Sequence, residues 1–330
     1  MLIEVSEPSQ AGEARRHAMA FAEELHMGET RGGKIALATA EMATNLVKHA
    51  GKGHILIQRV QQNGQSGLRV MSVDKGPGIA DIGRALADGH STAGSMGTGL
   101  GAIKRASDSF HLYSAPGCGT VIDAEFWQQK HVPANLPVEV AVVSEPIHGE
   151  QACGDGWGIR ETAGGLLVMV VDGSGHGILA SEAAREAERV FAGAKTDSLL
   201  EIIDDVHAAL RKTRGAALSI ARINVEKGLL SFAGIGNVSA SIVTNGTSRG
   251  MVCHNGIVGQ QMQRVQEFTY PWEPGSTLVM HSDGLLTRWD LDHCPGIWNK
   301  PPSVIAALLH RDFCRGRDDV TVLVAKAART

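Results

Sequence analysis

The sequence lacks the features that mark secreted, membrane-spanning and nucleic-acid-binding proteins. Its five cysteines are odd in number and form no Cys-x-x-Cys pair, so reduced thiols are expected rather than a disulfide framework. No apolar run approaches the ~20 residues needed to cross a bilayer, and the first residues do not resemble a signal peptide. The net charge is -4 and no Lys/Arg run occurs, which argues against nucleic acid as a partner. A cytoplasmic protein without membrane insertion is therefore predicted.

The length of 330 residues predicts two domains, taking roughly 150 residues for each. A hydrophobic fraction of 43% is sufficient for two buried cores. The polar stretch 128–137 contains two prolines and is the predicted linker. It divides a first domain, residues 1–127, from a second domain, residues 138–330.

The expected elements place both domains in the α/β (α+β) class. In the first domain, helices are predicted over 9–26 and 34–50, with a β-hairpin over 110–126. In the second domain, many short strands surround two helices, predicted over 179–192 and 199–210. This pattern indicates a β-sandwich with helices packed outside it.

The first domain carries three motifs whose residue types suit ATP binding. Glu41, Asn45 and Lys48 follow i, i+4, i+7 spacing and share one helix face. Phosphoryl transfer needs a carboxylate that orients a hydroxyl proton and an oxygen ligand for Mg²⁺, which are the types of Glu41 and Asn45. The third motif is a glycine-rich run whose backbone N–H groups can face phosphate before a helix; it comprises Gly97, Thr98, Gly99, Leu100 and Gly101.

The remaining motif lies between the other two in the sequence and reads Asp74-Lys75-Gly76-Pro77-Gly78. Asp74 follows a predicted strand and can accept a hydrogen bond from an adenine amino group. Gly76 and Gly78 leave room where a base must enter. Each motif alone is most often a solvated helix face or an ordinary turn. Their order and spacing together favour a nucleotide site.

In this order the motifs resemble those of the GHKL ATP-binding fold, and most closely the RsbT-like serine/threonine switch kinases. The resemblance covers about residues 1–127. It implies an α/β sandwich that binds ATP and Mg²⁺ beneath a short lid near residues 89–98. By this resemblance, Glu41 is the catalytic base, Asn45 holds Mg²⁺, Asp74 binds adenine, and Thr120 supports the adenine side.

Four aspartates in the second domain lie at or near predicted strand ends or turns: Asp155, Asp172, Asp283 and Asp318. Hard divalent cations prefer such oxygen ligands, and a pair of cations can activate water and clamp a phosphate. A single Asp-Gly dipeptide would indicate only a turn.

The segments around these aspartates resemble the SpoIIE branch of PP2C-type phosphatases over roughly residues 138–327. They include Val170 to Gly177, His281 to Gly284 and Arg317 to Val322. The local forms Cys153-Gly154-Asp155 and Arg214-Gly215-Ala216 resemble its RsbX-like members. The resemblance implies two Mn²⁺ or Mg²⁺ ions, with Asp172 bridging both. The carbonyl of Gly173 and the other three aspartates complete the ligand set. His176 is open to interpretation as a ligand, an acid or a turn-forming residue, and the last is favoured.

The two resemblances predict a bifunctional switch that phosphorylates and dephosphorylates a partner protein. The partner is expected to carry a STAS domain of the anti-anti-sigma or stressosome type, and a homodimer is left open. One alternative hypothesis is a phosphatase whose first domain only captures a partner in a nucleotide-dependent way. Another is a phosphatase that is gated by ATP or ADP occupancy of the first domain. Glu41 argues against the first alternative, because a pure binding module does not need a carboxylate there.

Overall fold

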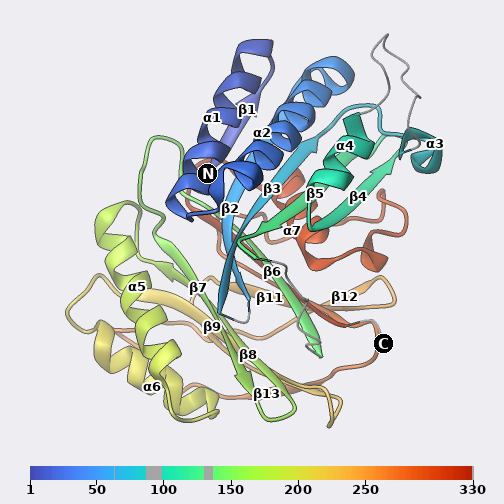
Figure 1. Cartoon of the computed structure of the whole chain (residues 1–330). Coiled ribbons are helices and arrows are strands. Elements are labelled where there is room, and N and C mark those ends of the chain that lie inside the picture. The colour runs from blue at the N-terminus through green and yellow to red at the C-terminus, as the bar shows by residue number, and fades with distance from the viewer. Residues whose placement is uncertain (63, 87–98, 130–136, 329–330) are drawn as a thin grey trace. The chain divides into compact units, whose positions relative to one another are not determined.

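The computed structural model describes residues 1–62, 64–86, 99–129 and 137–328 (Figure 1). The chain forms two compact units. Unit 1 comprises Met1–Ala134 and Asp292–Lys300, and unit 2 comprises Asn135–Leu291 and Pro301–Thr330. The predicted linker over 128–137 lies mostly outside the described residues, as do Gly97, Thr98 and the lid predicted near 89–98. The predicted domain limits therefore stay predictions.

Unit 1 contains one antiparallel sheet in the order β1-β2-β3-β5-β4. Its strands are β1 (Leu2–Val5), β2 (Gly53–Gln62), β3 (Gln65–Asp74), β4 (Ser109–Ala115) and β5 (Gly119–Trp127). The helices are α1 (Pro8–Glu24), α2 (Gly28–Asn45), α3 (Ile82–Leu86) and α4 (Gly99–Ala106), with a π-helix over Leu46–Ala50.

One face of this sheet is covered by helices α1, α2 and α4 (Figure 1). In α1, Ala14, Ala18 and Ala22 recur every four residues and are buried, so the helix packs through a face of small side chains. Ile35 of α2 and Ile103 of α4 join the same core. The helix predicted over 34–50 begins earlier, at Gly28, and its last turn is π-helical.

Unit 2 contains two five-stranded sheets. The first has the order β13-β10-β9-β8-β7, and the second has the order β12-β11-β14-β15-β6. The strands of the first sheet are β7 (Asp155–Thr162), β8 (Gly165–Gly173), β9 (Ala216–Asn224), β10 (Leu229–Ile235) and β13 (Phe268–Pro271). Those of the second are β6 (Val138–Glu145), β11 (Ser239–Thr244), β12 (Thr247–Gly250), β14 (Thr277–His281) and β15 (Val320–Ala327).

The apolar run in β8 shows how the layers of unit 2 are built. Leu166, Val168 and Val170 enter a core shared with the second sheet, whereas the alternate residues Leu167, Met169 and Val171 enter a core with two helices. A strand buried on both faces reads as a continuous apolar run because successive side chains alternate between the faces. The two helices are α5 (Ile178–Gly193) and α6 (Leu199–Leu210).

The sequence pattern predicts two helices in this unit but not the third, α7 (Pro302–Phe313), which lies against β6 and β15. All residues from Pro302 to His310 are buried, so α7 lacks the polar face that gives a helix its periodic pattern. The short 3₁₀ turn Ile297–Asn299 precedes it and belongs to unit 1. Within the described residues, no helix has the length and apolar character needed to cross a membrane.

Candidate active sites

The end of α2 brings Glu41 and Asn45 beside the start of α4. A Cβ atom at Gly99 would lie 2.9 Å from Glu41 Oε2 and 3.7 Å from Asn45 Oδ1. A side chain at position 99 would therefore displace the Glu41 carboxylate, whereas its contact with the Asn45 amide would be an ordinary one. Lys48 lies one turn further on, in the π-helix, and is exposed, whereas Glu41 and Asn45 are half-buried.

Helix α4 begins with Gly99, Leu100 and Gly101, so the described part of the glycine-rich run is the first turn of this helix. The first four N–H groups of a helix have no partner within it, and the N-terminus of a helix favours anions. Gly97 and Thr98 lie outside the described residues. The described part of the run therefore offers backbone donors next to Glu41.

Asp74 ends β3, and its carboxylate organises the turn that follows. Its Oδ1 accepts hydrogen bonds from the N–H of Gly76 (2.7 Å) and from the N–H of Thr120 (3.1 Å). Gly78 has φ +77° and a Cβ there would lie 2.0 Å from the carbonyl oxygen of Ala115. This conformation and this contact both require glycine. The Asp74 turn and the β4–β5 hairpin are thus packed together.

Ser114 links these two segments and was missed in the sequence. Its Oγ accepts from the N–H of Ile79 (2.7 Å), lies 2.9 Å from Thr120 Oγ1 and donates to the carbonyl of Gly119 (2.9 Å). Because β4 and β5 must pair before Ser114 meets Thr120, no local motif could have revealed it. Ser114 and Thr120 thus connect the β4–β5 hairpin to the segment 74–79.

In unit 2, each sheet supplies two of the four predicted metal ligands. Asp155 and Asp172 lie opposite each other on the paired strands β7 and β8. Asp283 follows β14 and Asp318 precedes β15, and these two strands are also neighbours. The fold therefore brings together residues that are far apart in the sequence.

Three glycines allow the backbone segments to approach closely. A Cβ at Gly173 would lie 2.3 Å from the carbonyl oxygen of Ala180, and one at Gly284 would lie 2.0 Å from that of Asp319. A Cβ at Gly154 would lie 2.7 Å from Asp319 Oδ2. The glycines beside Asp155, Asp172 and Asp283 are thus required by packing.

Burial and neighbouring negative charge raise the pKa values of three of these carboxyl groups, Asp155, Asp172 and Asp318. Burial, followed by the charges of Asp155, Asp283 and Asp318, raises the pKa of Asp172 to about 8. Burial also raises the pKa of Asp155 to about 7, with further contributions from Asp319 and Asp318. Burial and the neighbouring Asp283 raise the pKa of Asp318 as well. Such a concentration of negative charge is stabilised by protons or by a cation.

The donor set fits a hard divalent cation, although the side chains are not yet convergent. Within the described ranges, no three carboxylate, imidazole or thiol groups are already arranged to hold a metal ion. A cation between the four carboxylates would offset the repulsion among their charges. The ligands are oxygens only, the type that Mg²⁺ and Mn²⁺ prefer.

Neighbouring polar side chains orient the cluster. Ser282 Oγ donates to Asp155 Oδ2 (2.6 Å), and Asn237 Nδ2 donates to Asp283 Oδ2 (2.6 Å). Buried Asp319 instead accepts from the N–H groups of Ile147 and Gly154, both at 2.8 Å, so its carboxylate fixes a loop. Sequence reasoning missed these positioning roles, although Ser282 and Asn237 stand inside or beside the motifs.

Two exposed side chains, His176 and Arg214, lie at the loop that follows Gly173. His176 is exposed, and its Nδ1 lies 3.0 Å from Glu150 Oε1, an arrangement that orients the imidazole. Arg214 is exposed, and its Nη1 lies 3.1 Å from where a Cβ on Gly175 would be. Among the residues that the structure describes, no partner forms a hydrogen bond or ion pair with the Arg214 guanidinium. Arg214 is therefore available to an anion at this loop.

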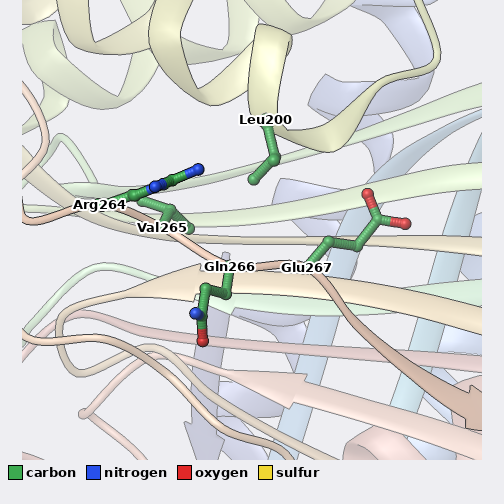
Figure 2. Close-up of a pocket in the computed structure, with 5 residues that line it drawn as sticks. All are labelled: Leu200, Arg264, Val265, Gln266 and Glu267. Carbon is green, nitrogen blue, oxygen red and sulfur yellow. The ribbon is translucent and has the colours of Figure 1, made fainter.

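A separate pocket of about 570 Å³ lies between α6 and the segment before β13 (Figure 2). It is lined by Leu200, Arg264, Val265, Gln266 and Glu267. None of these residues belongs to either candidate site.

Two family descriptions match the chain. The histidine kinase-like ATPase domain matches residues 5–125, and stage II sporulation protein E (SpoIIE) matches residues 162–328. The chain is a fusion of these two families. The family resemblances and the two-domain α/β fold class predicted from the motifs are thereby confirmed.

Two curated relatives resemble separate parts of the fusion. The serine/threonine-protein kinase RsbT of Bacillus subtilis (strain 168) is 42% identical over 114 residues, which are 34% of this chain and 86% of the relative. The phosphoserine phosphatase RsbX of the same organism is 27% identical over 155 residues, which are 47% of this chain and 78% of the relative. The fusion thus combines similarities to a kinase and to a phosphatase.

Solved structures resemble the fusion over more than half its length. A structure described as "The bacterial stressosome: a modular system that has been adapted to control secondary messenger signaling" is 27% identical, with a TM-score of 0.54. It covers 57% of this chain and 99% of that chain. A crystal structure of RsbX with magnesium has a TM-score of 0.52 at 24% identity, covering 60% and 99% respectively, and shows the same fold.

Proposed function

We propose that the fusion is a bifunctional signalling switch, with an ATP-dependent serine/threonine protein kinase in unit 1 and a metal-dependent phosphoserine/phosphothreonine phosphatase in unit 2. The observation that carries this proposal is the placement of Asp155, Asp172, Asp283 and Asp318 at strand ends of two sheets, near enough that the charges of the other three act on Asp172. The similarities to a kinase and a phosphoserine phosphatase support it. The proposed substrate is a STAS-domain protein of a partner-switching pathway.

In the kinase half, Glu41 would accept the proton of the substrate hydroxyl, and the Asn45 side-chain oxygen would be the ligand for Mg²⁺. Asp74 would accept a hydrogen bond from the adenine amino group. The first turn of α4 would place backbone N–H groups toward the phosphates. Positioning and charge neutralisation account for most of the catalysis in phosphoryl transfer, so these few groups suffice.

In the phosphatase half, the four aspartates and the carbonyl of Gly173 would hold two Mn²⁺ or Mg²⁺ ions, with Asp172 between them. When bound, the ions supply an activated water and neutralise phosphate charge. Arg214, which sits at the edge of the same loop, would bind the phosphate oxygens. Guanidinium groups suit this role because their planar donors match a phosphate.

The test uses a STAS-domain protein encoded near this gene, incubated with ATP and Mg²⁺ and resolved on a phosphate-affinity gel. Wild type, Glu41→Gln and Asp172→Asn are compared. Asp172→Asn should accumulate the phosphorylated partner, Glu41→Gln should not, and wild type with added Mn²⁺ should remove the phosphate. If no variant phosphorylates a partner that binds, the kinase proposal is wrong.

That last result would favour the second candidate function, a phosphatase with a nucleotide-gated binding module. The half-buried Glu41 beside Gly99 argues for the kinase, since partner capture alone does not require this carboxylate. Phosphoryl transfer distinguishes the two, because Glu41→Gln should keep partner binding in both cases and lose transfer only in a kinase.

A further inference from the structure

Unit 1 is completed by a segment from the phosphatase half of the sequence. Residues Asp292–Lys300 lie between β14 and α7 in the chain but belong to unit 1. The Tyr113 hydroxyl donates to the carbonyl of Pro295 (3.2 Å), and Cys118 Sγ donates to the carbonyl of His293 (2.9 Å). Lys300 Nζ lies 5.7 Å from the centre of the Tyr113 ring. We name this segment the 292–300 strap.

The strap is anchored by buried groups. Cys294 and Ile297 within it are 2% and 1% exposed, and Tyr113 is 2% exposed. Burial, together with Cys294 and Cys118, raises the pKa of Tyr113, so its hydroxyl stays protonated as a donor at neutral pH. Breaking these hydrogen bonds would leave buried polar groups without a partner, which costs free energy, so the strap should follow the position of the hairpin.

The strap meets the same hairpin that builds the adenine side of the nucleotide site. Tyr113 and Ser114 are consecutive in β4 and point to opposite faces of the sheet. Ser114 bonds to Ile79 in the Asp74 turn, and the N–H of Gly117 donates to the carbonyl of Pro77 (2.9 Å). A shift of the hairpin when a base binds would therefore reach the strap.

Both ends of the strap continue along the chain toward the metal cluster. The chain leaves β14 through Asp283-Gly284, and returns from α7 to the same place. The N–H of Leu286 donates to the carbonyl of Phe313 (2.9 Å), and the N–H of Arg315 donates to the carbonyl of Gly284 (2.8 Å). Asp318 follows three residues later. Asp283 and Asp318 thus lie at the two ends of the chain segment that contains the strap.

We propose that the 292–300 strap couples adenine-nucleotide binding in unit 1 to the metal site in unit 2. An occupied adenine site holds the hairpin and the strap in place, and this fixes the turn that carries Asp283 and the segment that carries Asp318. Nucleotide therefore strengthens metal binding. The inference rests on the proposed nucleotide and metal sites and adds to them a physical connection and a direction of regulation.

The test measures hydrolysis of p-nitrophenyl phosphate by the full chain as a function of Mn²⁺, with and without ADP. ADP is used because it cannot donate a γ-phosphate, and Mn²⁺ is kept in excess over it. The Mn²⁺ concentration for half-maximal rate should fall about fivefold or more with ADP, since couplings between sites are typically about 5–150-fold. The variants Tyr113→Phe and Cys118→Ala should keep the rate without ADP and lose most of this shift.

The chain contains matched controls for both substitutions. Tyr270 is the only other tyrosine and its hydroxyl accepts from the N–H of Val252 (3.3 Å) within unit 2. Cys253 donates to the carbonyl of Val238 (3.1 Å), as Cys118 does to His293. Tyr270→Phe and Cys253→Ala should keep the full ADP effect, which separates loss of coupling from loss of a buried hydrogen bond.

Hydrogen exchange of residues 292–300 gives a readout that does not depend on catalysis. ADP should slow exchange there in wild type and in both controls, but not in the Tyr113→Phe, Cys118→Ala double variant. An ADP effect that persists in the double variant overturns the coupling role. ADP binding, measured by calorimetry, separates failure of the coupling from failure of the nucleotide site. If ADP binds but neither hydrogen exchange nor Mn²⁺ dependence changes, the coupling is wrong and the nucleotide site stands. If ADP does not bind, both proposals are wrong.

Discussion

Replacing Asp172 by asparagine should stabilise the metal-free protein while abolishing phosphatase activity. The pKa of Asp172 is raised from its ordinary value of 3.8 to about 8 by burial and by three neighbouring carboxylates. A carboxyl whose pKa is raised on folding stabilises the fold at low pH, and this contribution is lost as pH rises toward the folded-state value. Asparagine has nearly the same shape and no charge, so the variant should not lose this stability as pH rises.

The magnitude follows from the pH range over which the folded and unfolded states differ in protonation. Each pH unit in that range changes the free energy of unfolding by about 1.4 kcal/mol. The interval from about pH 5 to about pH 8 lies within it, so the stability lost by wild type over this interval has an upper limit near 4 kcal/mol. The repulsion is shared between Asp172 and its neighbouring carboxylates, so about half of that limit is expected. A difference of about 2 kcal/mol corresponds to a melting temperature about 4–8 °C higher for a unit of this size.

The assay is thermal unfolding of wild type and Asp172→Asn in a chelator, at pH 5 and pH 8. The advantage of the variant should grow between the two pH values. Excess Mn²⁺ at pH 8 should reverse the order, because only wild type gains from bound metal. Asp205→Asn, an exposed change on α6, should alter nothing. If Asp172→Asn is less stable than wild type at pH 8 without metal, the carboxylates do not repel one another as argued.

Two further substitutions test the packing and the anion-binding parts of the phosphatase site. Gly284→Ala places a Cβ 2.0 Å from the carbonyl oxygen of Asp319, so it should destabilise unit 2 by about 3 kcal/mol or more in urea unfolding. Near-normal stability would show that the turn relaxes easily. Arg214→Ala should weaken inhibition by inorganic phosphate by about 10–100-fold, because a hydrogen bond to a charged group contributes about 1.5–3 kcal/mol. Arg211→Ala, at another exposed arginine, should have little effect, and equal inhibition of both variants would exclude Arg214 from phosphate binding.

The sequence predicted the parts of the fold and sites that depend on local chemistry. Asp172-Gly173 and Asp283-Gly284 could be found because an aspartate beside a glycine at a strand end is visible in a few letters, and the packing now explains both glycines. The apolar run Leu166 to Val171 has the length of a strand and lies in β8, where the structure buries both of its faces. In each case the residue type and its immediate neighbours are sufficient to indicate the structure.

The parts that the sequence did not predict depend on distant contacts. Ser114 acquires its role only when β4 pairs with β5, and Ser282 only when β14 is placed beside β7 and β15. Helix α7 is buried on all sides, so it shows no amphipathic period. The 292–300 strap is a short polar and aromatic stretch without a motif, and nothing in it indicates that it belongs with the first half of the chain.

Joining the two proposed activities in one chain constrains how they can be regulated. The kinase step would move the γ-phosphate of ATP to a hydroxyl, and the phosphatase step would move it to water, so the sum is ATP hydrolysis. Since the two halves are present in equal amounts, their balance cannot be set by relative expression. Linkage is reciprocal, so a strap that lets nucleotide strengthen metal binding also lets metal strengthen nucleotide binding. The two sites would then be loaded together, and the phosphorylation state of the bound partner, which fits only one site at a time, would decide the direction of transfer.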